Sequence, residues 1–161
     1  MNVGIYIYDQ AEVLDFSGPY EVISTASRVC TGDLPLTVFL VAESTDIVTA
    51  RAGFRVLPDY GFNHHPPIDV LIVAGGVYTD EIKKPQVIDW ITQQGASASI
   101  VASVCTGAFL LAKAQLIQAH RVTTHWEDIA DLRQMFPALE VLEGVRWVDQ
   151  GRVLTSGGIS A

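Results

Sequence analysis

The chain has 161 residues, of which 49% are hydrophobic and 17% are charged. This composition excludes a disordered chain and predicts one folded domain, residues 1–161, with a core of its own. The formal net charge of −8 argues against direct binding of nucleic acid or of an anionic membrane by this segment.

The cysteine content and the first residues indicate a cellular setting. The two cysteines, Cys30 and Cys105, lack the short spacing of a zinc site and do not form a disulfide framework. The N-terminus has neither a basic start nor a cleavage site, so we expect no signal peptide. The uncharged stretch 90–112 is interrupted by glycine and polar residues and is not expected to span a membrane. We therefore expect a reduced, cytoplasmic protein without metal or cofactor.

Apolar runs alternate with helical patterns along the chain. Buried strands are predicted at 3–8, 36–41, 69–73 and 99–104, and shorter strands at 122–124, 139–142, 145–148 and 153–155. Helices are predicted at 19–29, opened by Pro19, and at 86–94, 108–116 and 126–135, with a small hairpin within 47–57. Apolar strands followed by helices predict an α/β fold, a three-layer αβα sandwich around a mostly parallel, flavodoxin-like sheet.

The sharpest chemical feature follows the strand at 99–104. In Ser-Val-Cys-Thr-Gly-Ala, residues 103–108, a potential nucleophile stands between a strand and a helix and is followed by small residues. This pattern is typical of a nucleophile elbow, and a helix N-terminus behind Cys105 would lower the pKa of its thiol. The alternative is that Cys105 is a small buried core residue. The local pattern leaves both interpretations open.

Two further groups follow strands at the same edge of the sheet, where sites form in such folds. The Gly75-Gly76 pair would let backbone approach a ligand, and its N–H groups would form an oxyanion hole with that of Thr106; an ordinary turn is the alternative. Asp15 is either a helix-capping residue or a proton-transfer partner for the cysteine.

The histidines are less informative. His125 is expected to be either a pocket wall or a helix-start residue. The adjacent His64 and His65 have no evident acidic partner, so a metal site is not expected there.

The ordered motifs resemble those of the ThiJ/PfpI superfamily, relatives of class I glutamine amidotransferases. The resemblance covers essentially the whole chain and rests on five motifs in order: 14–19 (LDFSGP), 74–76 (AGG), 103–108 (SVCTGA), 123–126 (TTHW) and 155–161 (TSGGISA). It favours Cys105 as the functional centre. Two branches share this set, namely isonitrile hydratase and the N-terminal sensor domain of AraC-type regulators.

The resemblance implies roles for individual residues. Cys105 would attack an isonitrile carbon and Asp15 would transfer protons. The N–H groups of Gly76 and Thr106 would stabilise the developing charge, and the Thr106 hydroxyl would orient water or substrate. Superfamily proteases carry histidine directly after the cysteine, so Thr106 argues against protease activity. The expected catalytic residues are Cys105, Asp15 and Thr106, and the expected substrate-binding residues are Gly75, Gly76, Gly107 and His125.

Three functions follow, of which the small-molecule hydratase is favoured. The alternatives are a ligand-sensing domain of an AraC-type regulator and a redox protein with an oxidisable Cys105. A small-molecule ligand and a homodimer are the expected partners. The superfamily continues beyond the last motif into a further helical stretch, so we expect that this helical part is missing and that part of the sheet or pocket is uncovered.

Overall fold

A central sheet of mostly parallel strands organises the computed structural model, which describes residues 1–32 and 35–159. Five parallel strands and one antiparallel edge strand follow the order β2-β1-β5-β6-β10-β9. These are β1 (Asn2–Tyr6), β2 (Thr37–Val41), β5 (Val70–Val73), β6 (Ile100–Val104), β9 (Trp147–Asp149) and β10 (Val153–Ser156). The predicted parallel sheet is thus confirmed. Ser160 and Ala161, which end the last family motif, lie outside the described residues.

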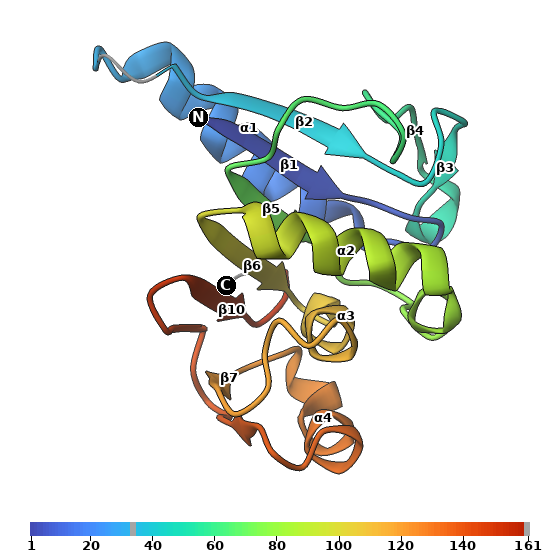
Figure 1. Ribbon diagram of the computed structural model, residues 1–161, viewed down its shortest axis with the longest axis vertical. Helices are drawn as coiled ribbons and strands as arrows, with labels where there is room; N and C mark the ends of the chain where they lie inside the picture. The colour runs from blue at the N-terminus through green and yellow to red at the C-terminus, as the bar shows by residue number, and fades with distance from the viewer. Residues whose placement is uncertain (33–34, 160–161) are drawn as a thin grey trace.

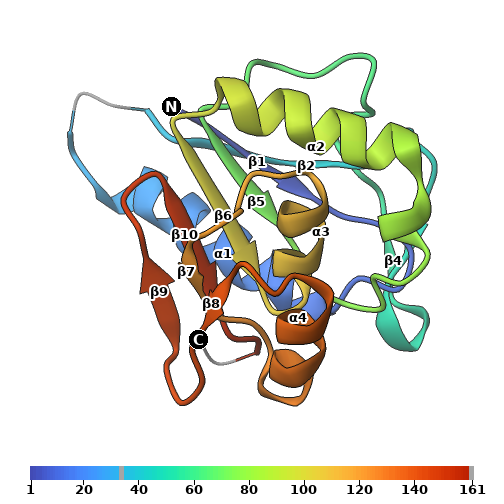
Figure 2. The ribbon, with the colours of Figure 1, turned by 60° about the horizontal axis from the view of Figure 1, so that its bottom comes forward.

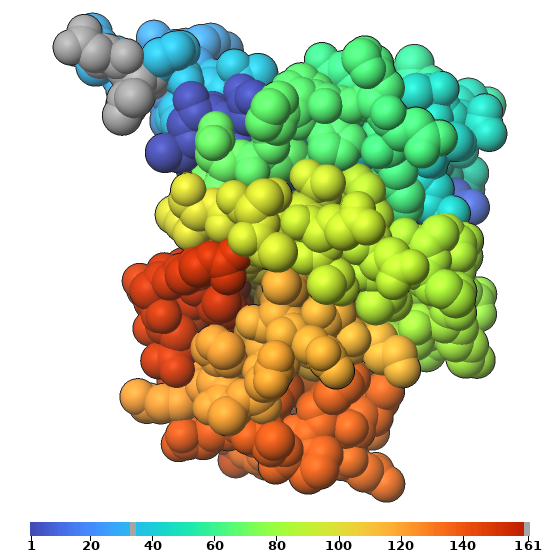
Figure 3. All heavy atoms as spheres, viewed as in Figure 1, coloured from blue at the N-terminus to red at the C-terminus, as the bar shows by residue number. Residues whose placement is uncertain are grey.

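Helices cover both faces of this sheet, as the sandwich prediction requires. α1 (Val13–Val29) lies on one face, and α2 (Pro85–Ser97) and α3 (Gly107–Lys113) lie on the other (Figures 1 and 2). The space-filling view shows α2 crossing the middle of its face (Figure 3). Among the described residues, no helix is long and apolar enough to cross a membrane.

Two small sheets flank the central one. β3 (Val48–Thr49) and β4 (Arg55–Val56) form the expected antiparallel hairpin around a short 3-10 turn, η1 (Arg51–Gly53). β7 (Arg121–Val122) pairs in parallel with β8 (Glu140–Val141), and α4 (Ile129–Met135) packs against β8. The remaining short helical turns are η2 (Glu81–Lys83) and η3 (Trp126–Asp128).

The start of α1 differs from the prediction. The helix begins at Val13, six residues before Pro19, which lies inside it. Proline lacks an N–H and therefore leaves one carbonyl of the first turns without its helical partner. The helix start is instead set by contacts distant in sequence, because the N–H of Glu12 donates to the carbonyl of Gly75 at 2.8 Å. Asp15 consequently lies on the first turn of a helix and not in a loop.

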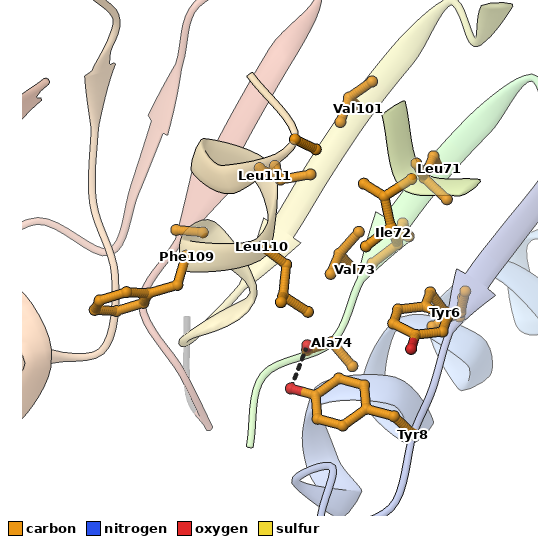
Figure 4. Packing of buried hydrophobic residues seen from close by; sticks show 14 of the residues in the cluster. Tyr6, Tyr8, Leu71, Ile72, Val73, Ala74, Val101, Phe109, Leu110 and Leu111 are labelled. Atoms are coloured by element: carbon orange, nitrogen blue, oxygen red, sulfur yellow. Dashed lines mark hydrogen bonds between the residues drawn. The ribbon is translucent and has the colours of Figure 1, made fainter. Parts of the chain in front are cut away.

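The core lies on both sides of β1, β5 and β6. Ile5, Leu71 and Val101 are fully buried, as expected for strands covered on both faces. Figure 4 shows Leu71 and Val101 within this core. Two buried tyrosines require polar partners. The hydroxyl of Tyr8 donates to the carbonyl of Ala74 at 3.0 Å, and that of Tyr6 donates to the buried carboxylate of Glu81 at 2.5 Å. The first of these bonds fixes the backbone where β5 ends.

Arg152 connects the last core strand to α2. Its guanidinium donates to the carbonyl of Ala98 at 3.0 Å and also to that of Gly95, so it caps the C-terminal end of the helix. The terminal carbonyls of a helix have no partner within the helix. We expect Arg152→Ala to lower the free energy of unfolding by about 1–3 kcal/mol.

Urea unfolding followed by circular dichroism measures this change. Arg55→Ala is the matched control, because the exposed Arg55 side chain makes no hydrogen bond or ion pair with the described part of the chain. Equal losses in the two variants would contradict the capping role of Arg152.

Candidate active site

Cys105 occupies the sharp turn between β6 and α3. Its φ is 55°, in the left-handed region that non-glycine residues rarely adopt, which is the strained geometry of a nucleophile elbow. Its N–H donates to the carbonyls of Ser156 and Gly157, at 3.1 and 2.9 Å. A side chain at Gly107 would overlap the carbonyl oxygen of Val73, so only glycine allows this turn to pack against β5. The predicted elbow is present.

Parallel register brings the Gly75-Gly76 turn beside the elbow. Val73 of β5 is opposite Ser103 of β6, so the residues that follow the two strands run side by side. A Cβ on Gly75 would lie 2.6 Å from the Cβ of Cys105 and 2.7 Å from both Oδ2 of Asp15 and the nitrogen of Thr106. Position 75 therefore has no room for a side chain. The structure brings Asp15, Gly75, Cys105 and Thr106 into one cluster.

The Asp15 carboxyl is buried without a regular hydrogen bond. Asp15 is 1% exposed, and within residues 1–32 and 35–159 neither carboxylate oxygen has a hydrogen-bond partner. Burial raises the pKa of this carboxyl from 3.8 to about 6, while the nearby backbone N–H groups of Ile159 and Gly75 oppose the rise. Asp15 is therefore a group that can gain or lose a proton near neutral pH.

The Cys105 thiol differs from the prediction of a lowered pKa. Burial and then the negative charge of Asp15 raise its pKa from 9.0 to about 12, although the N–H of Thr106 acts in the opposite direction. The helix behind the cysteine has only seven residues. Its N-terminus does not outweigh desolvation of a side chain that is 7% exposed. At neutral pH the resting group is a neutral thiol beside Asp15.

The Thr106 hydroxyl is already engaged. It donates to the carbonyl of Gly76 at 2.8 Å and accepts from the N–H of the same residue at 2.9 Å. We call this pair of bonds the threonine clasp. Because the Gly76 N–H is used in the clasp, it is not free to stabilise developing charge as expected. The hydroxyl likewise joins the two turns, and its expected role in orienting water or substrate stays a prediction.

His125 lies beside the thiol, at the start of η3. A Cβ on Gly158 would lie 2.8 Å from the Sγ of Cys105 and 3.4 Å from the Nδ1 of His125, so the imidazole and the thiol share one neighbour. The hydroxyl of Thr124 donates to the carbonyl of Cys105 at 2.8 Å. This position agrees with a pocket wall. Gly158 was not among the expected site residues. It could have been found, because the glycine pair 157–158 directly follows a strand, as the Gly75-Gly76 pair does.

The other histidines lie elsewhere and have local partners. The ring of His65 accepts from the indole N–H of Trp90 at 3.1 Å, and the ring of His64 packs edge-on against Tyr60. In the described ranges, no group of three or more His, Cys, Asp or Glu side chains is placed to hold a metal ion.

A cavity of about 620 Å³ lies next to Asp15, between α1 and the strands β6 and β10. Asp15 is the ionisable residue of its lining, which is otherwise mainly apolar and includes Leu14, Pro19, Val22, Val104, Leu154 and Ile159. The cavity is large enough for a small organic group.

Comparisons with known proteins agree with the motifs and the fold. The sequence matches the DJ-1/PfpI family over residues 1–161. It is 35% identical to isonitrile hydratase of Pseudomonas putida over 162 aligned positions, covering 100% of this chain and 67% of that protein. It is 25% identical to the HTH-type transcriptional regulator GbdR of Pseudomonas aeruginosa, covering 98% of this chain and 42% of the regulator.

A solved structure gives the same fold. A ThiJ/PfpI family protein from Pseudomonas syringae superposes with a TM-score of 0.86 at 25% identity, covering 99% of this chain and 63% of that one. The chain thus spans about two thirds of the hydratase and less than half of the regulator.

Asp15 should make stability depend on pH. The folded pKa of about 6 lies above the unfolded value of 3.8, so the protonated carboxyl favours the fold and this contribution is lost as pH rises through 6. Asp15→Asn should therefore gain stability relative to the wild type between about pH 4 and pH 7, by roughly 2–3 kcal/mol. Urea unfolding at pH 4.5 and 8 measures the gain. The exposed Glu21→Gln is the control, and a pH-independent difference for Asp15→Asn would refute the assignment.

The threonine clasp should be needed for the fold of the turns. Thr106→Val keeps the shape of the side chain but removes both hydrogen bonds and leaves the N–H and carbonyl of Gly76 without partners. We expect a loss of about 2–4 kcal/mol, against less than about 1 kcal/mol for Thr106→Ser, which retains the hydroxyl. Thermal and urea unfolding compare the two variants. Equal stability of the valine and serine variants would show that the clasp does not hold the turns together.

Proposed function

Because the chain belongs to the DJ-1/PfpI family, we propose that it is a cysteine-dependent hydratase that adds water to an isonitrile and releases an N-substituted formamide. The observation that carries this proposal is the buried pair of a neutral Cys105 thiol and an Asp15 carboxyl that has no hydrogen-bond partner among the described residues. An uncharged substrate suits such a site, because a charged one would lose its hydration without gaining a partner. The predicted homodimer remains a prediction.

The pair can move one proton without an external base. At neutral pH the Asp15 carboxylate, whose pKa is about 6, takes the proton of the Cys105 thiol as Sγ bonds to the isonitrile carbon. The carboxyl then gives this proton to the same carbon. The product of the step is a thioimidate, in which carbon is bonded to sulfur, hydrogen and nitrogen.

Water completes the reaction. Asp15, again a carboxylate, takes a proton from a water molecule that attacks the thioimidate carbon. Asp15 gives that proton to the nitrogen, which becomes the N–H of the formamide. The carbon–sulfur bond then breaks as the new hydroxyl on carbon becomes the carbonyl, and the hydroxyl proton passes to sulfur, which leaves as the thiol. The sum is one isonitrile and one water giving one formamide. The Thr106 N–H, which lies near the sulfur, stabilises negative charge during transfer.

A ligand-sensing domain is the second candidate, and the match to the GbdR regulator across 98% of this chain favours it. A sensor would bind a ligand in the cavity beside Asp15 without turnover. The redox alternative has less support, because oxidation proceeds through the thiolate and burial raises the pKa of Cys105 to about 12.

Formamide production from an aryl isonitrile, measured by liquid chromatography and mass spectrometry, tests the proposal. We expect kcat/KM to rise with pH up to about 6 and then to level, because the carboxylate form of Asp15 must accept the thiol proton. Cys105→Ala should abolish turnover, and Asp15→Asn should lower it about 100-fold or more and remove the inflection.

Glu21→Gln, on the exposed side of the same helix, is the matched control and should behave as the wild type. A buffer blank corrects for acid hydrolysis of the isonitrile. Wild-type turnover no faster than that of Cys105→Ala would refute the hydratase and leave the sensor as the better assignment.

A further inference from the structure

Two glycines from different strand ends lie close to the Cys105 side chain. A Cβ at Gly75 would lie 2.6 Å from the Cβ of Cys105. A Cβ at Gly158 would lie 2.8 Å from its Sγ and 2.9 Å from its Cβ. Non-bonded carbon atoms pack at about 3.5–4.0 Å, so neither position accepts a side chain unless the cysteine moves.

Gly158 is the glycine at which an added side chain would meet the reactive atom itself. A Cβ at Gly75 would meet the Cβ of the cysteine, whereas a Cβ at Gly158 would meet Sγ and would also lie 3.4 Å from the Nδ1 of His125. The backbone of Gly158 therefore borders the space between thiol and imidazole. With Cys105 only 7% exposed, little room remains around the sulfur for the substituents of an attacked carbon.

Electrophilic carbons differ in the room they need. The carbon of an isonitrile is terminal and is bonded to nitrogen alone, so it can approach sulfur end-on. A carbonyl carbon of an ester or amide carries two substituents besides its oxygen, and sulfur must reach it across their plane. Reaction requires an approach of about 3–3.5 Å, which would press such substituents against the enclosing backbone.

We infer that Gly158 is a specificity-determining residue, and that it restricts Cys105 to electrophiles whose reacting carbon is terminal and sterically bare. This inference deepens the proposed function and rests on its assignment of Cys105 as the nucleophile. On this inference, the backbone that packs closely around the sulfur selects the substrate class. Recognition of a leaving group does not select it.

Two alkylating reagents test the enclosure in the wild-type protein. Iodoacetamide presents a primary carbon and loses iodide as sulfur bonds, whereas N-ethylmaleimide presents a ring carbon and adds the thiol across its double bond. The exposed Cys30 is an internal control for reagent reactivity. Peptide mass spectrometry gives the labelling rate at each cysteine. Both reagents consume thiolate, so the raised pKa of Cys105 cancels from the comparison of the two reagents.

We expect the Cys105-to-Cys30 rate ratio to be about tenfold or more lower with N-ethylmaleimide than with iodoacetamide. Equal ratios for the two reagents would overturn the inference, because an open thiol would not distinguish them. This comparison needs no variant and so does not depend on how a substitution folds.

Gly158→Ala tests the residue directly. We expect the added methyl to slow iodoacetamide labelling of Cys105 about tenfold and to leave Cys30 unchanged. Gly32→Ala adds the same methyl where no described residue lies within 4 Å and should leave both rates unchanged. A folded Gly158→Ala protein labelled at the wild-type rate would overturn the inference.

Formamide production is measured on the same samples. Selective labelling together with an absence of formamide would refute the hydratase while supporting steric selection at Cys105. Formamide production with equal labelling ratios would support the hydratase and overturn the role of Gly158. The two proposals therefore fail separately.

Discussion

The absence of a side chain at position 75 is the constraint on which the site depends. Three backbone segments meet there: the entrance to α1, the end of β5 and the elbow after β6. The carbonyl of Gly75 accepts from Glu12, Gly76 bridges to Ala11, and the Thr106 hydroxyl bonds to both polar backbone groups of Gly76. The Asp15 carboxyl of α1 and the Cys105 side chain after β6 can lie close together because position 75 carries no side chain.

The burial of Asp15 and Cys105 side by side costs free energy that the rest of the fold must offset. Asp15 is desolvated without a hydrogen-bond partner in the described part of the chain, and Cys105 holds a strained φ of 55°. Such features persist when the surroundings over-determine them, and here the buried strands β5 and β6 on both sides do so. The site gains from the same desolvation, because it moves the pKa of Asp15 into the range where a proton can be exchanged at neutral pH.

Sequence patterns predicted the parts of the molecule that follow local rules. Fully apolar strands predicted the parallel sheet, and small residues after Cys105 predicted the elbow. The predicted start of α1 was wrong. Pro19 carries a strong local signal for a helix start, whereas the helix begins beside Glu12, whose N–H bonds to Gly75, a residue distant in the sequence. The direction of the cysteine pKa was wrong for a related reason. Local pattern shows the helix behind Cys105 but not the burial and the carboxylate that outweigh it. The threonine clasp joins Thr106, which follows β6, to Gly76, which follows β5. No spacing in the sequence indicates this contact.

The hydrogen bonds made by the Cys105 N–H also make the elbow depend on a segment that is synthesised much later. Both acceptors, the carbonyls of Ser156 and Gly157, belong to the last core strand and the residue after it. A growing chain leaves the ribosome from its N-terminus, so β1, β5 and β6 can pair before these acceptors exist. The elbow then lacks the partners that hold its strained turn. The turn around Cys105 is thus complete only once β10 has joined the sheet, and a chain synthesised only as far as β6 does not carry the finished site.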